Sequence, residues 1–152
     1  MNKFNFLFLL LLCHVNYAQS ERSLEDTQAY IVKMINKDGW VENSTKKRLR
    51  AEFKGKLLRI VTMNKDFSEA LDNGAVYNFT NVYRFKGPIK EPGDVAHLII
   101  WADYLVDLES KRWKKKAFDF EMHNYDEGEQ VMIAFQHLNK LLLESKPAVE
   151  KF

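Results

Sequence analysis

The sequence predicts an α+β domain in which one helix precedes six or seven antiparallel strands, and a long amphipathic helix follows them. Three observations lead to this fold class. Apolar residues recur at helical spacing over 24–36, alternate with polar residues over much of 46–123, and return to helical spacing over 126–145. Because a sheet with alternating residues buries one face and each helix buries one stripe, we expect a bent sheet or small barrel with the last helix packed against it.

The helix predicted over residues 24–36 has an apolar face and signals at both ends. Ser23 precedes it as an N-cap, Asp26 stands where a capping box usually has Glu, and Asp38-Gly39 marks its end. The residues that share its apolar face are Leu24, Thr27, Ile31, Met34 and Ile35. We expect this face to pack on the chain's own core.

The first predicted hairpin has one apolar face and one basic face. Leu49, Ala51 and Phe53 alternate with charged residues, which is typical of a half-buried strand. Gly55 permits a tight turn, and the partner strand follows over residues 57–63.

Turn signals divide the middle of the predicted sheet. Residues 65–71 suit a single helical turn, and Asp72-Asn73-Gly74 predicts a tight turn because Asn-Gly accepts positive φ values. Gly87-Pro88 and residues 91–94 are predicted as turns that break the chain between strands. A strand with a bend or bulge at Asn81 is predicted from aromatic residues of one parity, namely Tyr77, Phe79, Tyr83 and Phe85.

The last predicted hairpin contains the most apolar strand, residues 95–108, whose even positions carry no charge and must face inward. In the return strand, Lys114 and Lys116 have the same parity as the apolar Phe118 and Phe120 and would therefore face the core. Burying two charged ammonium groups there would cost more free energy than the core could supply. Either the hairpin tip projects past the sheet into water, or a bulge near Trp113 switches the faces. The projecting tip is the preferred interpretation.

The helix predicted over residues 126–145 is the most regular element. Asp126 is its predicted cap, Glu129 completes the capping box, and Ser145-Lys146-Pro147 ends the helix. Its continuous apolar stripe consists of Val131, Ala134, Phe135, Leu138, Leu141 and Leu142.

Residues 1–18 are typical of a secretory signal peptide: Lys3 is followed by an apolar run, and Ala18 precedes a polar segment. The run is shorter than the roughly 20 residues of a membrane span. Leu12 precedes Cys13 where lipoprotein processing needs a small residue, so we do not expect a lipid anchor. Cleavage would leave no cysteine, which favours export to the periplasm or medium of a Gram-negative bacterium.

Residues 19–152 then form a single domain. With 23 Lys and Arg against 21 Asp and Glu, the chain has a formal net charge of +2, which argues against nucleic acid as a partner. No transmembrane span is expected after removal of the signal.

The element order resembles the pleckstrin-homology-like (PH-like) superfold, a bent antiparallel sheet closed by a C-terminal helix. The segments Glu25–Ile31 and Ala134–Leu141 also resemble the helices that open and close small uncharacterised exported bacterial proteins. The first resemblance implies a fold and the second implies no activity. The basic face of the first hairpin resembles the place where PH-like domains hold phosphoinositides, but no pocket motif accompanies it and that function is not carried over; the face consists of Arg48, Arg50, Lys54 and Lys56.

Residues capable of catalysis are scattered, and we predict no catalytic, cofactor-binding or metal-binding residue and no cofactor. His97, His123 and His137 show no paired spacing, and no serine lies in a nucleophile motif. The ligand-rich segment 123–129 is explained as a helix cap. Asp103, Asp107 and Glu109 share a strand face, which is more simply a polar outer surface.

The basic segment 111–116, which surrounds Trp113, suits either a site that binds an anion or a solvated hairpin tip that discourages edge-to-edge pairing of sheets.

We expect a non-enzymatic exported interaction or binding domain, with an envelope protein or a small ligand as partner. The alternative is a periplasmic binder of a small apolar or amphipathic ligand, held between sheet and helix. A hydrolase would need His97 or His123 within hydrogen-bonding distance of a carboxylate in a cleft.

Overall fold

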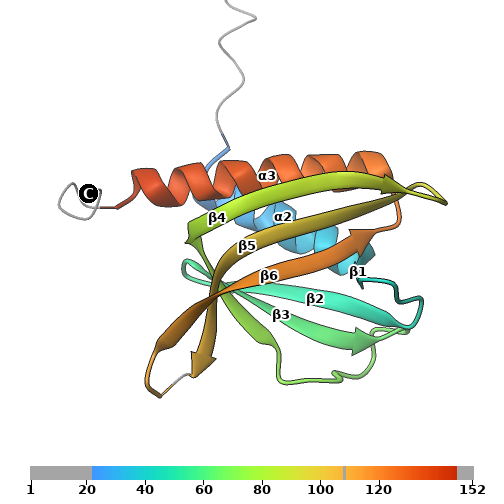
Figure 1. The fold of residues 1–152 in the computed structure, drawn as a ribbon, viewed down its shortest axis with the longest axis horizontal. Helices are drawn as coiled ribbons and strands as arrows, with labels where there is room; N and C mark the ends of the chain where they lie inside the picture. The colour runs from blue at the N-terminus through green and yellow to red at the C-terminus, as the bar shows by residue number, and fades with distance from the viewer. Residues whose placement is uncertain (1–21, 108, 147–152) are drawn as a thin grey trace, which may run out of the picture.

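The computed structural model describes residues 22–107 and 109–146, and the predicted signal peptide and Cys13 lie outside them. Six strands form a closed antiparallel barrel, and two helices lie against it (Figure 1). The elements in order are α2 (Leu24–Asp38), β1 (Gly39–Val41), β2 (Lys47–Lys54), β3 (Leu57–Asn64), β4 (Ala75–Glu91), β5 (Val95–Asp107), β6 (Arg112–Met122) and α3 (Tyr125–Glu144). The predicted fold class is confirmed.

Three details of the predicted strands are wrong. Gly87-Pro88 does not end a strand, because β4 continues through it with a register shift between Lys86 and Ile89. Residues 65–71 form no helical turn but a loop that bridges back to Met63 through Ala70. The strand β1 was not expected at all, since its three residues are too few to show alternation.

Helix α2 completes the barrel where β1 is too short to cover β2. Only Trp40 and Arg48 pair between the two strands, so the seam between β1 and β2 needs other partners. The Asn36 side chain supplies them: Oδ1 accepts from Ala51 N at 2.6 Å, and Nδ2 donates to Ala51 O at 3.3 Å. Arg48 Nη2 also donates to the carbonyls of Asn36 and Lys37, at 2.8 and 2.6 Å. A side-chain amide therefore takes the place of a neighbouring strand.

Replacing Asn36 by Ala is expected to lower the free energy of unfolding by about 1–3 kcal/mol, because both backbone groups of Ala51 lose their partner. Urea denaturation measures the loss. The control is Lys33→Ala on the exposed side of the same helix, for which we expect little change. An equal loss in the two variants would contradict the bridging role of Asn36.

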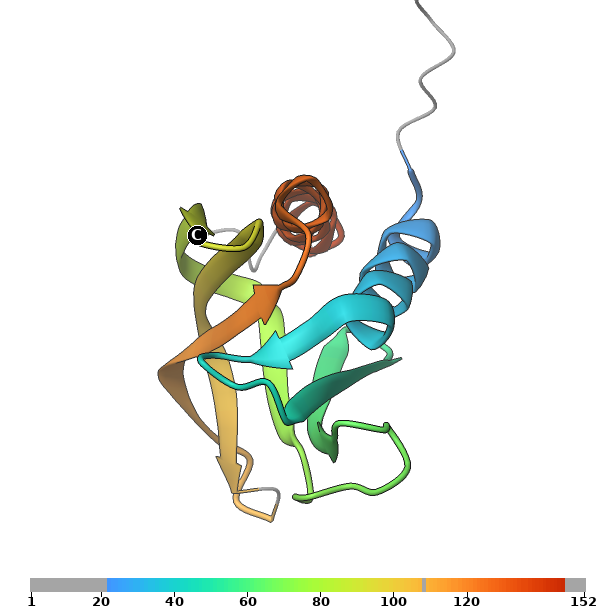
Figure 2. The same ribbon diagram turned by 90° about the vertical axis from the view of Figure 1, so that its right-hand side faces the viewer.

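Helix α3 lies along the barrel beside α2, over β4 and β5 (Figure 2). Its N-cap is Asn124, whose side chain accepts from Glu127 N, so the prediction of Asp126 as the cap was wrong by two residues. Phe135 is fully buried, and its ring centroid lies 4.9 Å from that of Phe79 on β4. Phe135 and the other buried side chains of α3 form one core cluster with those of the sheet. No helix in the described ranges is long and apolar enough to cross a membrane.

The hairpin of β5 and β6 projects beyond the barrel (Figure 1, lower left). Its register is continuous from Ala96–Met122 to Leu105–Trp113, and the register shift lies beyond that pair, between Leu105 and Asp107, so it does not change the face of Lys114 or Lys116. Lys114 and Lys116 keep the inward parity and are nevertheless exposed. The preferred interpretation of the basic tip is confirmed.

Candidate functional site

The projecting hairpin forms one wall of an open groove, here called the hairpin groove. The opposite wall is the turn end of β2 and β3 together with the start of β4. The groove has a volume of about 900 Å³ and is lined by Glu52, Phe53, Lys54, Leu57, Arg59, Asn73, Gly74, Val76, Tyr104, Leu105 and Val106. Its apolar side chains are only half-buried, because the hairpin projects past the end of the barrel core.

Cationic side chains lie around the apolar lining of the hairpin groove. Lys54 and Arg59 belong to one wall, where Arg59 Nη1 forms an ion pair with Glu52 at 2.8 Å. On the other wall, Nζ of Lys116 and Lys114 lie 4.3 and 5.9 Å from the ring centroid of Tyr104. The arrangement combines an apolar floor with an excess of positive charge.

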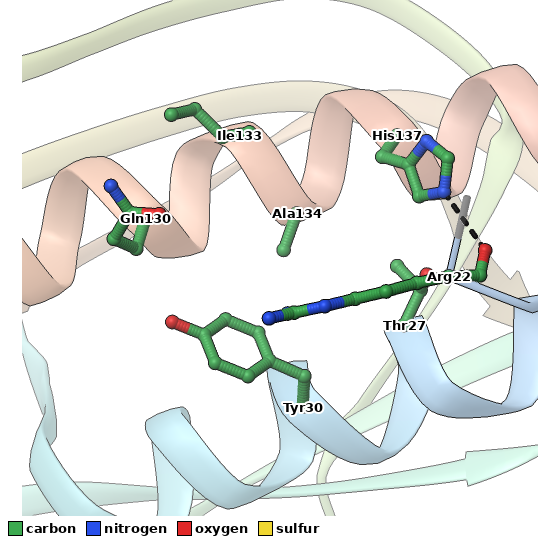
Figure 3. Close-up of a pocket in the computed structure, with 7 residues that line it drawn as sticks. All are labelled: Arg22, Thr27, Tyr30, Gln130, Ile133, Ala134 and His137. Carbon is green, nitrogen blue, oxygen red and sulfur yellow. Dashed lines mark hydrogen bonds between the residues drawn. The ribbon is translucent and has the colours of Figure 1, made fainter. Parts of the chain in front are cut away.

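A smaller cleft of about 190 Å³ lies between α2 and α3 (Figure 3). The Arg22 side chain extends across it, and its guanidinium carbon lies 4.8 Å from the ring centroid of Tyr30. His137 Nε2 donates to Arg22 O at 3.0 Å. Because the side chain of Arg22 occupies this cleft, the cleft is a weaker candidate for a ligand-binding site than the hairpin groove.

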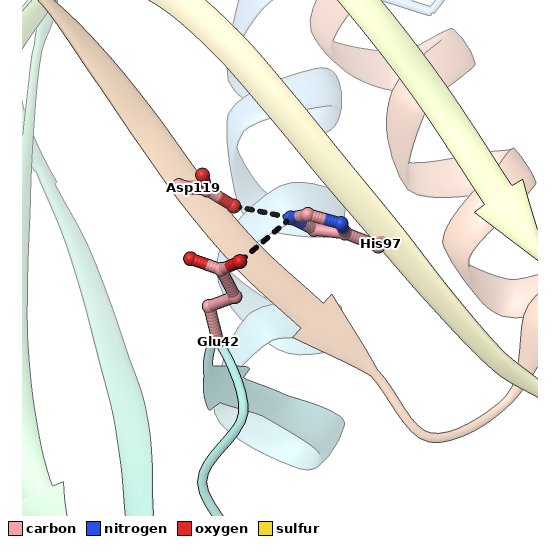
Figure 4. Close-up of side chains that lie close together, drawn as sticks. All are labelled: Glu42, His97 and Asp119. Atoms are coloured by element: carbon pink, nitrogen blue, oxygen red, sulfur yellow. Dashed lines mark hydrogen bonds and ion pairs between the residues drawn. The ribbon is translucent and has the colours of Figure 1, made fainter. Parts of the chain in front are cut away.

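A second candidate site lies on the outer face of the barrel, where His97 meets carboxylates from three other segments. We call Glu42, His97 and Asp119 the His97 cluster (Figure 4). His97 Nε2 lies 2.5 Å from Asp119 Oδ1 and 3.9 Å from Glu42 Oε1, and its Nδ1 lies 3.3 Å from Glu91 Oε1. The His97 side chain is only 11% exposed, so these oxygens make up most of its polar surroundings.

The fold brings these groups together through strand pairing and one turn. His97 on β5 lies between β4 and β6, which carry Glu91 and Asp119. Glu42 belongs to the turn after β1, where Asn43 adopts a φ of 55° and donates its N–H to Glu121 Oε1 at 2.8 Å. Glu121 is itself buried and pairs with His97 across the strands. The bonded Glu121 carboxylate therefore holds the turn that presents Glu42.

The electrostatics of the His97 cluster favour a positive charge. Burial by itself lowers the pKa of His97, but the hydrogen bond to Asp119 and the carboxylate charges outweigh it, and the pKa is raised. Within residues 22–107 and 109–146, no lysine or arginine forms an ion pair with Glu42, Glu91 or Asp119. One imidazole thus faces three carboxylates.

His97 satisfies the distance that a hydrolase would require, yet the arrangement differs from that of a general base. A general base needs a free nitrogen lone pair within reach of the proton it removes. Both ring nitrogens of His97 face carboxylates instead. The cluster is therefore better suited to hold a cation, whether a proton or a metal ion, than to activate a nucleophile.

The remaining residues considered from the sequence do not converge. His123 stacks on Trp40 with ring centroids 4.6 Å apart. Asp103 accepts hydrogen bonds from Asn81 Nδ2 and Tyr83 Oη at 2.7 and 2.5 Å, and Asp107 accepts from Ser110 at the hairpin tip. These groups form local surface contacts and no common site.

His97 is recognisable from the sequence as a candidate, whereas its carboxylate partners are not. Glu91 was assigned to a turn, and Asp119 and Glu121 were given no role. The parity of Asp119 and Glu121, opposite the odd positions of β5, was the available signal. It needs the strand register, which alternation alone does not supply.

No protein-family model matches the chain, and no curated protein or solved structure shows significant similarity to it.

Proposed function

We propose that this protein is a non-enzymatic binding domain, exported to the periplasm or medium, whose hairpin groove takes an amphipathic molecule with an anionic head group. The observation that carries the proposal is the groove of about 900 Å³, whose apolar floor adjoins Lys54 and, beside Tyr104, Lys114 and Lys116. The proposal differs from the alternative drawn from the sequence in two ways: the ligand lies between two hairpins rather than between sheet and helix, and its head group is anionic.

The apolar floor supports the tail half of the proposal. Phe53, Leu57 and Val76 lie on the barrel side, and Leu105 and Val106 lie on the projecting hairpin. None of them is fully buried, so a bound hydrocarbon chain removes further apolar surface from water. Burial of such surface is worth about 25 cal/mol per Å².

The cations support the head-group half of the proposal. Lys114 and Lys116 are exposed and lie beside Tyr104, which lines the groove. An anionic head group above Tyr104 gains attraction from both ammonium groups, and the low dielectric of the apolar wall strengthens it. A neutral or cationic head group gains nothing there.

The test uses dansyl-undecanoate as a fluorescent probe, with its methyl ester as the uncharged comparison. We expect saturable binding of the acid, and a weaker affinity for the ester. Leu57→Asp, which places a carboxylate in the floor, should abolish binding. The double variant K114E/K116E should weaken binding of the acid about tenfold, equivalent to about 1.4 kcal/mol, while leaving the ester unaffected.

The matched control is Lys46→Glu, an exposed residue just before the start of β2, at the opposite end of that strand from the groove. Circular dichroism confirms that each variant is folded. Binding that tolerates both groove variants, or no binding at all, refutes the proposed ligand site. Native mass spectrometry of protein recovered from the cell envelope tests export, since the expected chain begins at Gln19; an intact Met1 would overturn that part.

A further inference from the structure

The donor set of the His97 cluster contains one imidazole nitrogen and two carboxylate oxygens, which come from three separate segments. The three ligand atoms all lie within 4.8 Å of one another. Zinc binds nitrogen and oxygen ligands at about 2.0–2.2 Å, so the ligand atoms of a zinc site lie about 3–4 Å apart. The Glu42 side chain is 42% exposed, and its Oε1 accepts a hydrogen bond from Asn43 Nδ2 at 3.2 Å, which a bound metal would replace as the carboxylate turns inward. Asp119 Oδ1, which lies 2.5 Å from His97 Nε2, would move slightly outward.

Glu91 lies beside the second ring nitrogen of His97, where a metal-binding histidine usually has a carboxylate or carbonyl partner. Such a histidine donates its second ring N–H to a carboxylate or carbonyl, which fixes the tautomer and leaves the other nitrogen for the metal. Here His97 Nδ1 faces Glu91 Oε1 at 3.3 Å, and Nε2 faces Asp119 and Glu42. The nitrogen that faces the two carboxylates is therefore the one available to a cation.

The charge balance of the cluster also favours a divalent cation. Glu42, Glu91 and Asp119 are three carboxylates around one imidazole, and the described residues offer them no lysine or arginine ion pair. The buried Glu121 lies across the strand from His97 and adds a fourth negative group nearby. A proton on His97 balances only one of these charges.

We propose that Glu42, His97 and Asp119 form a binding site for a divalent transition-metal cation, with Glu91 as a positioning residue for the imidazole. Imidazole suits zinc and its neighbours in the first transition row, whereas calcium and magnesium prefer all-oxygen sites. Three protein ligands leave the remaining coordination positions to water. The site lies on the barrel wall and shares no residue with the hairpin groove, so it is independent of the ligand proposed above.

The experiment titrates the full processed chain with ZnCl2 by calorimetry, and with CoCl2 by visible absorption, which reports on the coordinating atoms. We expect one metal ion per chain. His97→Gln should abolish binding, and His123→Gln is the matched control that should retain it, because His123 stacks on Trp40 outside the cluster. CaCl2 should bind much more weakly than ZnCl2.

Two further variants separate the roles of the carboxylates. Glu91→Gln should weaken zinc binding about 10- to 100-fold without changing the cobalt spectrum, because Glu91 orients the ligand and is not itself a ligand. Asp119→Asn should change both the affinity and the spectrum. Glu42→Gln alters an exposed side chain, so it supplies the test of metal loss even if the His97 variant does not fold.

The proposal is overturned if no saturable binding with a stoichiometry of one occurs. It is also overturned if His123→Gln lowers the affinity as much as His97→Gln does, since the metal would then bind elsewhere. Either result leaves the hairpin groove untouched, because its test uses a different probe and different variants.

Discussion

Replacing Phe135 by Ala is expected to lower the free energy of unfolding by about 3–5 kcal/mol, the range for truncation of a buried phenylalanine. Phe135 is fully buried where α3 meets the barrel. Its ring centroid lies 4.9 Å from that of Phe79, 6.1 Å from that of Phe118 and 6.2 Å from that of Phe120. The three partners come from β4 and β6, which limits how far the surroundings can collapse into the space.

Chemical denaturation of the wild type and the variant measures the loss. Ile133→Ala is the matched control, since Ile133 belongs to the same helix but is 51% exposed. Its truncation should change stability by only a few tenths of a kcal/mol, as is usual for surface substitutions. Similar losses in both variants would show that α3 does not seal the barrel core through Phe135.

Replacing Gly128 by Ala is expected to destabilise the protein by about 1–3 kcal/mol, although glycine-to-alanine changes inside helices usually stabilise by about 1 kcal/mol. An added Cβ on Gly128 would lie 2.3 Å from Ala96 Cβ and 3.5 Å from Met122 Cβ. Helix α3 and strand β5 approach so closely here that one methyl group forces them apart. The sign of the change is therefore the informative result.

A double-mutant cycle with Ala96→Gly isolates this close approach. Removing the Ala96 methyl group makes room for the new one, so the double variant should lose less stability than the two single variants together. If Gly128→Ala instead raises the urea midpoint, as helix propensity alone would have it, the helix does not approach β5 this closely.

The elements with a long apolar period could be predicted from the sequence. The stripe of α3 and the even positions of β5 have enough repeats to be unambiguous, and they determine where the core lies. The position of the N-cap of α3 could not be predicted in the same way, because Asn124 and Asp126 are both good N-cap residues and tertiary packing decides between them. The continuation of β4 through Gly87-Pro88 also depends on tertiary structure, because β5 pairs with the residues of β4 on both sides of the register shift between Lys86 and Ile89.

The candidate sites were harder to predict because they consist of residues from different segments. His97 and its partners Glu91 and Asp119 share no local motif, and the turn that carries Glu42 follows a strand of only three residues. The hairpin groove arises because the basic tip leaves the barrel. The sequence predicted that tip from the cost of burying Lys114 and Lys116, but alternation does not reveal what the exposed hairpin faces.

The pairing of β1 with β6 joins Gly39 to Met122, residues from nearly opposite ends of the domain. Contacts between such distant residues require most of the chain to be present and are slow to form. The ring of strands therefore closes only after synthesis has passed β6. Until β6 is complete, β1 lacks the neighbour that closes the ring, and the emerging strands keep an open edge.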